Sequence, residues 1–285
     1  MHLRVMTKAD ICAAQRLREI ADWNQTKIDW ERFLEASEAG CFVAEFDDKV
    51  CGTAATISFE NRFAWVGMVL VDPAYRGRGI GTKLLEQTIE YIDTRRIPCI
   101  KLDATPQGKP LYEKLGFVPE YEIERWTLRR SPVQVTGLSE AGRPQGVSPG
   151  VLEDIFETDR TVFGADRSFL LKSLHQQTPA FTAGIKTEGT LQGYSFGRKG
   201  SFADQLGPWM ANDEPTARTL LERFVTLSLR DVLIVDHLKS NSVAESLLRS
   251  FGFSHTRPLT RMYRGHNAHP GRVENLCAIL GPEFG

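Results

Sequence analysis

Three glycines and two arginines lie within the six residues from Arg76 to Gly81, a composition suited to holding an anion. Glycine lets the backbone approach a phosphate closely and turn its N–H groups toward it. Apolar side chains at helical spacing follow from Ile80 onward, so the glycines stand at a helix N-terminus, where the helix dipole favours negative charge. A pyrophosphate site is therefore predicted on the backbone N–H groups of Arg76, Gly77, Arg78, Gly79, Ile80, Gly81 and Thr82.

An almost continuous apolar run precedes this loop, from Ala64 to Val71. Such a run is typical of a strand buried on both faces. Asp72 and Pro73 end the run, because proline has no N–H to donate to a strand neighbour. The central stretch of the chain is thus predicted to be a strand, a tight turn and a helix.

Two general phosphate-binding motifs fit this stretch less well. A P-loop requires Gly-Lys-Ser/Thr, whereas Gly81 is followed by Thr82 and Lys83, so that motif is excluded. A dinucleotide fingerprint requires G-x-G-x-x-G directly after the strand, and counting from Gly77 puts Thr82 at the third glycine position. Asp103 follows the glycines at a sequence separation that is plausible for the acidic residue that binds the ribose. The dinucleotide interpretation therefore stays open.

A third pattern is more specific. The sequence V-x-P-x-x-R-G-x-G-x-G, from Val71 to Gly81, resembles the acetyl-CoA pyrophosphate loop of the GNAT superfamily of N-acetyltransferases. The stretch L-Y-E-K-L-G-F is also similar to this family, with Tyr112 five residues before Phe117. The resemblance implies an α/β fold (an α+β mixed sheet flanked by helices), with acetyl-CoA as co-substrate and no metal.

The resemblance also implies roles for individual residues. Tyr112 is the candidate acid that protonates the leaving thiolate. Full proton transfer would be uphill, since a free tyrosine has a pKa near ~10 and a thiol near ~8.5. The nearby helix N-terminus and arginines are predicted to lower the pKa of Tyr112. The strand backbone would pair with the pantetheine arm and polarise the thioester carbonyl, through Met68, Val69, Leu70 and Val71.

The amine acceptor must lose a proton before it attacks, because an alkylamine with a pKa near ~10 is mostly charged at neutral pH. Many family members carry a glutamate five residues before the proline, and Met68 stands at that position here. The sequence therefore names no general base. Asp103, Glu60, a residue of the second half and a water chain stay open.

The second half of the chain resembles the first, and the segment from Gly116 to Arg125 aligns without a gap at an offset of 136 residues, which pairs Phe117 with Phe253 and Arg125 with Arg261. At that offset Tyr112 falls on Leu248, and the glycine-rich turn has no counterpart. We therefore expect tandem GNAT-like folds, with an acetyl-CoA-binding domain at 1–130, a linker at 131–150 and a degenerate domain with a C-terminal tail at 151–285.

Composition limits the possible partners and the compartment. The 35 Lys and Arg against 36 Asp and Glu give a net charge of −1, which predicts no nucleic-acid binding. Five scattered cysteines without a C-x-x-C pair indicate free thiols in a reducing compartment. There is no signal sequence and no apolar run of about 20 residues, so the expected location is cytoplasmic and off the membrane.

The leading functional prediction is an N-acetyltransferase that transfers acetyl from acetyl-CoA to a primary amine, by direct attack in a ternary complex. The acceptor would be a small molecule or an exposed amino group. Two alternatives stay open, namely a non-catalytic acetyl-CoA-binding sensor or scaffold and a nicotinamide-dependent oxidoreductase. The sequence leaves the acceptor, the role of the second domain and the oligomeric state undetermined.

Overall fold

The computed structural model describes residues 1–130 and 147–285. By Cα proximity the chain forms two compact units, and neither is continuous in sequence. The first unit comprises Met1–Glu120, Arg261–His269 and Phe284, and the second comprises Tyr121–Thr260, Pro270–Glu283 and Gly285. Most of the predicted linker lies outside the described residues, and its last two residues, Pro149 and Gly150, already open a helix.

The predicted mixed α/β fold is confirmed, as is the central strand, turn and helix. In the first unit the hydrogen-bonded strand order is β1-β2-β3-β4-β5-β11, where β11 is the late strand Ser254–Gly265. The pairing is antiparallel up to β4 and parallel between β4 and β5. The elements are β1 (His2–Val5), α1 (Ile11–Ile20), α2 (Lys27–Ala36), β2 (Phe42–Phe46), β3 (Lys49–Phe59), β4 (Phe63–Val71), α3 (Ile80–Thr94), β5 (Cys99–Ala104), α4 (Lys109–Lys114) and the first residues of β6 (Val118–Arg129).

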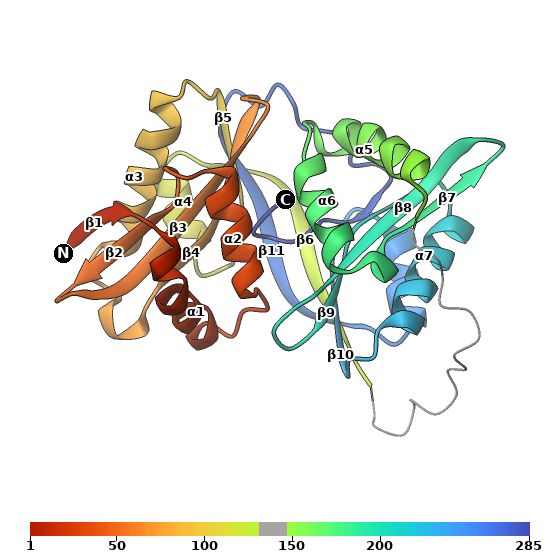
Figure 1. Ribbon diagram of the computed structural model, residues 1–285, viewed down its shortest axis with the longest axis horizontal. Coiled ribbons are helices and arrows are strands. Elements are labelled where there is room, and N and C mark those ends of the chain that lie inside the picture. The colour runs from red at the N-terminus through yellow and green to blue at the C-terminus, as the bar shows by residue number, and fades with distance from the viewer. Residues whose placement is uncertain (131–146) are drawn as a thin grey trace. The chain divides into compact units, whose positions relative to one another are not determined.

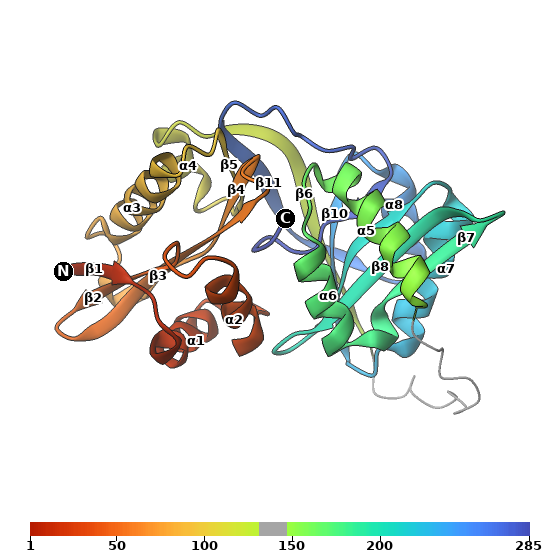
Figure 2. The ribbon, with the colours of Figure 1, turned by 45° about the horizontal axis from the view of Figure 1, so that its top comes forward.

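Helix α3 covers one face of this sheet, opposite α1 and α2 (Figure 2). Its side chains at helical spacing are buried, with Leu84 and Leu85 both 0 % exposed. Leu84 packs with residues of β2 and β3, and Leu85 packs with residues of β4 and β5. The buried side chains of α3 therefore hold the helix, and the glycine-rich loop before it, against strands β2 to β5.

The second unit has the same kind of architecture (Figure 1). Its strand order is β11-β6-β10-β12-β9-β8-β7. The elements are α5 (Pro149–Phe163), α6 (Ser168–Gln177), β7 (Ala183–Thr187), β8 (Thr190–Lys199), β9 (Asp204–Ala211), α7 (Glu214–Leu227), β10 (Val232–Leu238), α8 (Ser242–Ser250), β11 (Ser254–Gly265) and β12 (Leu276–Ala278).

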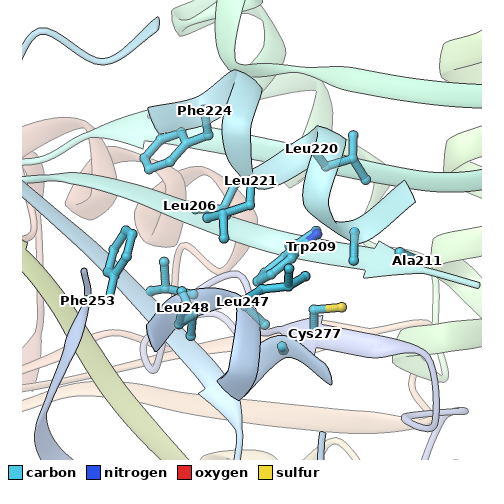
Figure 3. Packing of buried hydrophobic residues seen from close by; sticks show 14 of the residues in the cluster. Leu206, Trp209, Ala211, Leu220, Leu221, Phe224, Leu247, Leu248, Phe253 and Cys277 are labelled. Carbon is cyan, nitrogen blue, oxygen red and sulfur yellow. The ribbon is translucent and has the colours of Figure 1, made fainter. Parts of the chain in front are cut away.

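The core of the second unit lies between its sheet and two helices. Figure 3 shows side chains of α7 and α8 gathered around Trp209 of β9. Trp209, Leu221 and Leu248 are each 0 % exposed. Leu221 stands 136 residues after Leu85, so the aligned helices of the two halves use the same position for core packing.

The structure reproduces the offset of 136 residues at the end of each repeat. The bounds of β6 and β11 differ by that offset at both ends. Gly116 and Gly252 precede the strands with left-handed φ angles of +86° and +85°, which favour glycine. The amide of Phe117 donates to the Tyr112 carbonyl at 3.1 Å, and that of Phe253 donates to the Leu248 carbonyl at 3.0 Å. The two segments therefore share one backbone conformation.

Each of these strands ends in the unit formed mainly by the other repeat. Arg125 of β6 lies in the second unit, where its Nε and terminal nitrogen donate to the two carboxylate oxygens of Asp236, each at 2.7 Å. The aligned Arg261 of β11 lies in the first unit and binds Asp103 in the same two-pronged way, at 2.8 Å for both bonds. The repeats thus exchange strands, and a buried ion pair anchors each exchanged strand.

None of the helices among residues 1–130 and 147–285 combines the length and the apolar character needed to cross a bilayer.

Candidate active site

The glycine-rich loop is an exposed turn between the end of β4 and the start of α3. Gly77 and Gly79 have φ angles of +74° and +75°, and no atom lies within 4 Å of a Cβ built on either residue. Gly81 is closer to its surroundings, since its built Cβ would lie 3.6 Å from Val71 Cγ2 and 3.8 Å from Leu111 Cδ2. The loop therefore has open space beside Gly77 and Gly79, whereas Gly81, in the first turn of α3, lies close to side chains of β4 and α4.

The backbone donors of this loop are available to an anion. Among the described residues, none accepts a hydrogen bond from the N–H groups of Gly77 to Thr82, whereas the N–H of Lys83 already donates to the Gly79 carbonyl at 3.0 Å. No side chain caps the N-terminus of α3. Consecutive unsatisfied N–H groups at a helix N-terminus favour phosphate oxygens. The N–H of Arg76, which the sequence analysis also predicted as a donor, instead donates to the Pro73 carbonyl at 3.3 Å. The other six predicted donors fit a pyrophosphate.

Both arginines of the loop are exposed. Arg76 Nε donates to the Val71 carbonyl at 3.2 Å, so its side chain lies along the end of β4. The Arg78 guanidinium lies over the rings of Phe46 and Tyr75, at 5.3 and 5.5 Å from the centroids. A cation–π contact retains the full charge of an arginine. Both side chains therefore keep positive potential close to the free N–H groups.

Strands β4 and β5 separate as they approach the loop. The register between them pairs Ala64 with Ile100 and Trp65 with Lys101, close to the start of each strand. β4 continues to Val71, and Met68, Val69, Leu70 and Val71 all lie beyond this pairing. The side of β4 that faces β5 thus carries backbone groups that are free to pair with an extended ligand.

Tyr112 lies on α4 and packs into the same hydrophobic cluster as Val69 of β4. Its ring makes an edge contact with Phe117 at 6.0 Å between centroids. Burial raises the pKa of Tyr112 to about 12. The predicted lowering of this pKa is therefore wrong, because desolvation of the phenolate outweighs any stabilisation by the loop charges.

The raised pKa predicts a specific loss of stability in alkali. Above pH 10 the unfolded chain ionises this tyrosine while the folded chain does not, so stability present below pH 10 is lost as the pH rises toward 12. The free energy of unfolding, measured by urea titration between pH 8 and pH 11.5, should fall more steeply for the natural protein than for Tyr112→Phe. Parallel curves for the two proteins would contradict this expectation.

Comparison with known proteins identifies the family of this chain. Residues 9–117 match the family model described as the acetyltransferase (GNAT) family, and residues 155–278 match a second one described as an acetyltransferase (GNAT) domain. The chain belongs to the GNAT superfamily of acetyltransferases. It carries two GNAT domains in tandem, and the family uses acetyl-CoA.

Some relatives of this tandem GNAT protein match nearly its whole length. Holothin acyltransferase of Pseudoalteromonas sp. is 23% identical over 268 residues, which are 92% of this chain and 87% of that protein. A crystal structure from Pyrococcus horikoshii, described as that of a putative acetyltransferase, matches this chain with a TM-score of 0.81 at 24% identity. The match covers 100% of this chain and 95% of that chain. A tandem GNAT protein from the clavulanic acid biosynthesis pathway has a TM-score of 0.62 at 12% identity, covering 93% and 98%. These structural likenesses show the fold.

The second GNAT unit has a short turn where the first unit has the glycine-rich loop. Only Asn212 and Asp213 separate β9 from α7. Asp213 caps the helix, since its Oδ1 accepts a hydrogen bond from the Thr216 N–H at 2.8 Å, and the bonds from Thr216 hold the pKa of this carboxyl below its usual range. A carboxylate thus occupies the helix N-terminus that the first unit leaves open. At the position of Tyr112, Leu248 is 0 % exposed in the core.

The structure also locates the two named candidates for a general base in the GNAT reaction. The side chain of Asp103 is fully buried and accepts two hydrogen bonds from Arg261. Glu60 lies 3.5 Å from the guanidinium of Arg62 at the turn between β3 and β4. Both carboxylates therefore lie beside a guanidinium, and the bond geometry of Asp103 suits a structural anchor.

Two side-chain interactions that support the loop were not predicted from the sequence. Asp72 Oδ1 accepts from the Ala74 N–H at 3.0 Å, and Asp72 Oδ2 accepts from Arg16 at 2.7 Å. The bond from Arg16 is the main cause that lowers the pKa of Asp72. The Asp-Pro pair at the end of the strand was a signal for the turn cap, whereas Arg16, 56 residues away, had none.

Proposed function

We propose that this GNAT protein transfers an acetyl group from acetyl-CoA to a primary amine, of a small molecule or an exposed amino group, by direct attack in a ternary complex. The first unit would hold acetyl-CoA. The observation that carries the proposal is the row of unsatisfied N–H groups from Gly77 to Thr82, directly after a strand that has parted from its parallel neighbour.

The residues that would hold acetyl-CoA follow from this arrangement. The pyrophosphate would accept hydrogen bonds from the loop N–H groups, with Arg76 adding charge. The pantetheine amides would pair with the free edge of β4 from Met68 to Val71, as a short added strand. When bound, acetyl-CoA supplies the acetyl group as a thioester, and the CoA sulfur leaves with a negative charge.

Tyr112 would act on that departing sulfur. With a pKa of about 12 its phenol stays protonated at neutral pH and can donate a hydrogen bond. Complete proton transfer to a thiolate is uphill by more than three pKa units. We therefore assign Tyr112 the role of a hydrogen-bond donor that stabilises the charge on sulfur and keeps its own proton. The CoA thiolate takes a proton from solvent when it leaves the site.

The second unit would not bind acetyl-CoA in the equivalent place. The carboxylate of Asp213 already takes the helix N-terminal donor of Thr216 and would repel a pyrophosphate. Leu248 offers no hydroxyl where the first unit has Tyr112. The proposed stoichiometry is one acetyl-CoA per chain.

Calorimetric titration with acetyl-CoA tests this proposal. We expect one site per chain, and Arg76→Glu should weaken binding about 10- to 100-fold because a charge-assisted bond to phosphate is replaced by repulsion. Arg218→Glu, near the start of the aligned helix α7, serves as the matched control and should leave affinity unchanged. Two sites per chain would overturn the assignment to the first unit alone, and absence of binding would overturn the proposed function.

A further inference from the structure

Strand β4 contains a bulge beside the point where it leaves β5. In its register with β3, Thr53 pairs with Leu70 and Ala55 pairs with Gly67. One residue of β3 therefore lies opposite two residues of β4, Met68 and Val69. Met68 has a φ angle of +55°, in the left-handed region that a side chain with a Cβ disfavours.

A side chain of the neighbouring strand holds this bulge in place. Thr53 is 0 % exposed, and its Oγ1 donates a hydrogen bond to the Met68 carbonyl at 2.7 Å. The carbonyl thus points toward β3. In a trans peptide the N–H of the next residue points the opposite way, so the Val69 N–H is directed away from β3 and toward the side of β5.

Val69 has no paired residue on either side within the described residues. The pairing of β4 with β5 ends at Trp65 and Lys101, and the register with β3 passes from Gly67 to Leu70. A disfavoured backbone conformation persists only while its surroundings hold it. Without the hydroxyl of Thr53, the Met68 carbonyl would lose its buried donor and the bulge would lose the bond that fixes its peptide plane.

We propose that Thr53 is a positioning residue for acyl transfer, which acts through the Met68 carbonyl to aim the Val69 N–H at the carbonyl oxygen of the bound thioester. This inference rests on the proposed function, because it assumes an acyl-CoA along β4. An N–H fixed in advance toward that oxygen stabilises the charge that develops on it during attack. Thr53 itself touches neither substrate.

The polarisation of the bound carbonyl provides a test that needs no acceptor. Infrared difference spectra with acetyl-CoA carrying ¹³C in its carbonyl should show a lower stretching frequency when it is bound to the natural protein than in water. Thr53→Val, which has nearly the same shape but no hydroxyl, should lose more than half of that downshift. Thr53→Ser should retain it. Thr56→Val is the matched control, since it removes another buried hydroxyl of β3 that contacts Ser37 and not β4.

Calorimetry on the same samples separates the possible outcomes. We expect Thr53→Val to bind acetyl-CoA within a few-fold of the natural affinity, and kcat to fall about 10- to 100-fold once an acceptor is in use. An unchanged downshift in Thr53→Val with binding intact would overturn the role of Thr53 alone. Failure of the natural protein to bind acetyl-CoA would overturn the proposed function as well. If Thr53→Val does not fold, Thr53→Ala gives the same comparison, and loss of the downshift in folded Thr53→Ser would contradict the proposal.

Discussion

Arg261→Met is expected to destabilise the first unit by about 3–5 kcal/mol. The substitution removes both charge-assisted hydrogen bonds that Asp103 receives from Arg261, and the side chain of Asp103 is fully buried. Breaking a buried pair by truncating one partner has this magnitude because the remaining charge keeps its desolvation penalty. The guanidinium also lies 4.5 Å from the centroid of the Trp65 ring, so fluorescence of Trp65 can follow unfolding in urea.

Two further proteins show whether the effect comes from the buried charge. Arg218→Met breaks an exposed ion pair with Glu214 and should cost less than about 1 kcal/mol. The double variant Asp103→Leu with Arg261→Met removes both charges and should recover much of the lost stability, since apolar replacement of a buried pair is often neutral. A cost for Arg261→Met no larger than that for Arg218→Met would show that the pair is not an anchor.

Tyr112→Phe is expected to lower kcat about 100-fold while leaving the Kd for acetyl-CoA nearly unchanged. Loss of a hydrogen-bond donor aimed at a charge that develops in the transition state has this magnitude. The hydroxyl lies on α4 and not among the loop donors, so binding should be retained. The assay is release of free CoA thiol with a panel of primary amines, which includes polyamines, aminoglycosides, amino acids and peptides.

Tyr75→Phe provides the comparison for this experiment. Tyr75 lies at the glycine-rich loop, where its ring contacts Phe46 and the Arg78 guanidinium, and its hydroxyl has no proposed part in the chemistry. It should keep kcat within about twofold. If Tyr112→Phe turns over as fast as Tyr75→Phe, then Tyr112 serves packing, and stabilisation of the leaving thiolate must come from elsewhere.

The sequence predicted those features that depend on neighbours close in the chain. The glycine-rich loop, the strand before it and the helix after it are local, and each is fixed by residue type and spacing. The end of β6 could be aligned with β11 because Gly116 and Gly252 meet the same demand for a left-handed φ. The resemblance to the GNAT family added the fold, which the structure confirms.

Features that depend on distant segments were not predictable in the same way. The partner of Asp103 lies 158 residues away on an exchanged strand, so a carboxylate that could have served as a base turns out to be an anchor. The direction of the pKa shift of Tyr112 required knowledge of its burial. The role of Thr53 requires the register of β3 against β4, which a threonine in a mostly apolar strand does not reveal.

The reciprocal positions of Arg125 and Arg261 also bear on modularity. A polypeptide ending at residue 130 would contain Asp103 without Arg261, and it would lack Met262, which packs in the cluster beneath α3 and α4. The second repeat alone would contain Asp236 without Arg125. Each repeat alone therefore lacks one arginine of a buried ion pair, so we expect neither repeat to be stable when it is produced without the other.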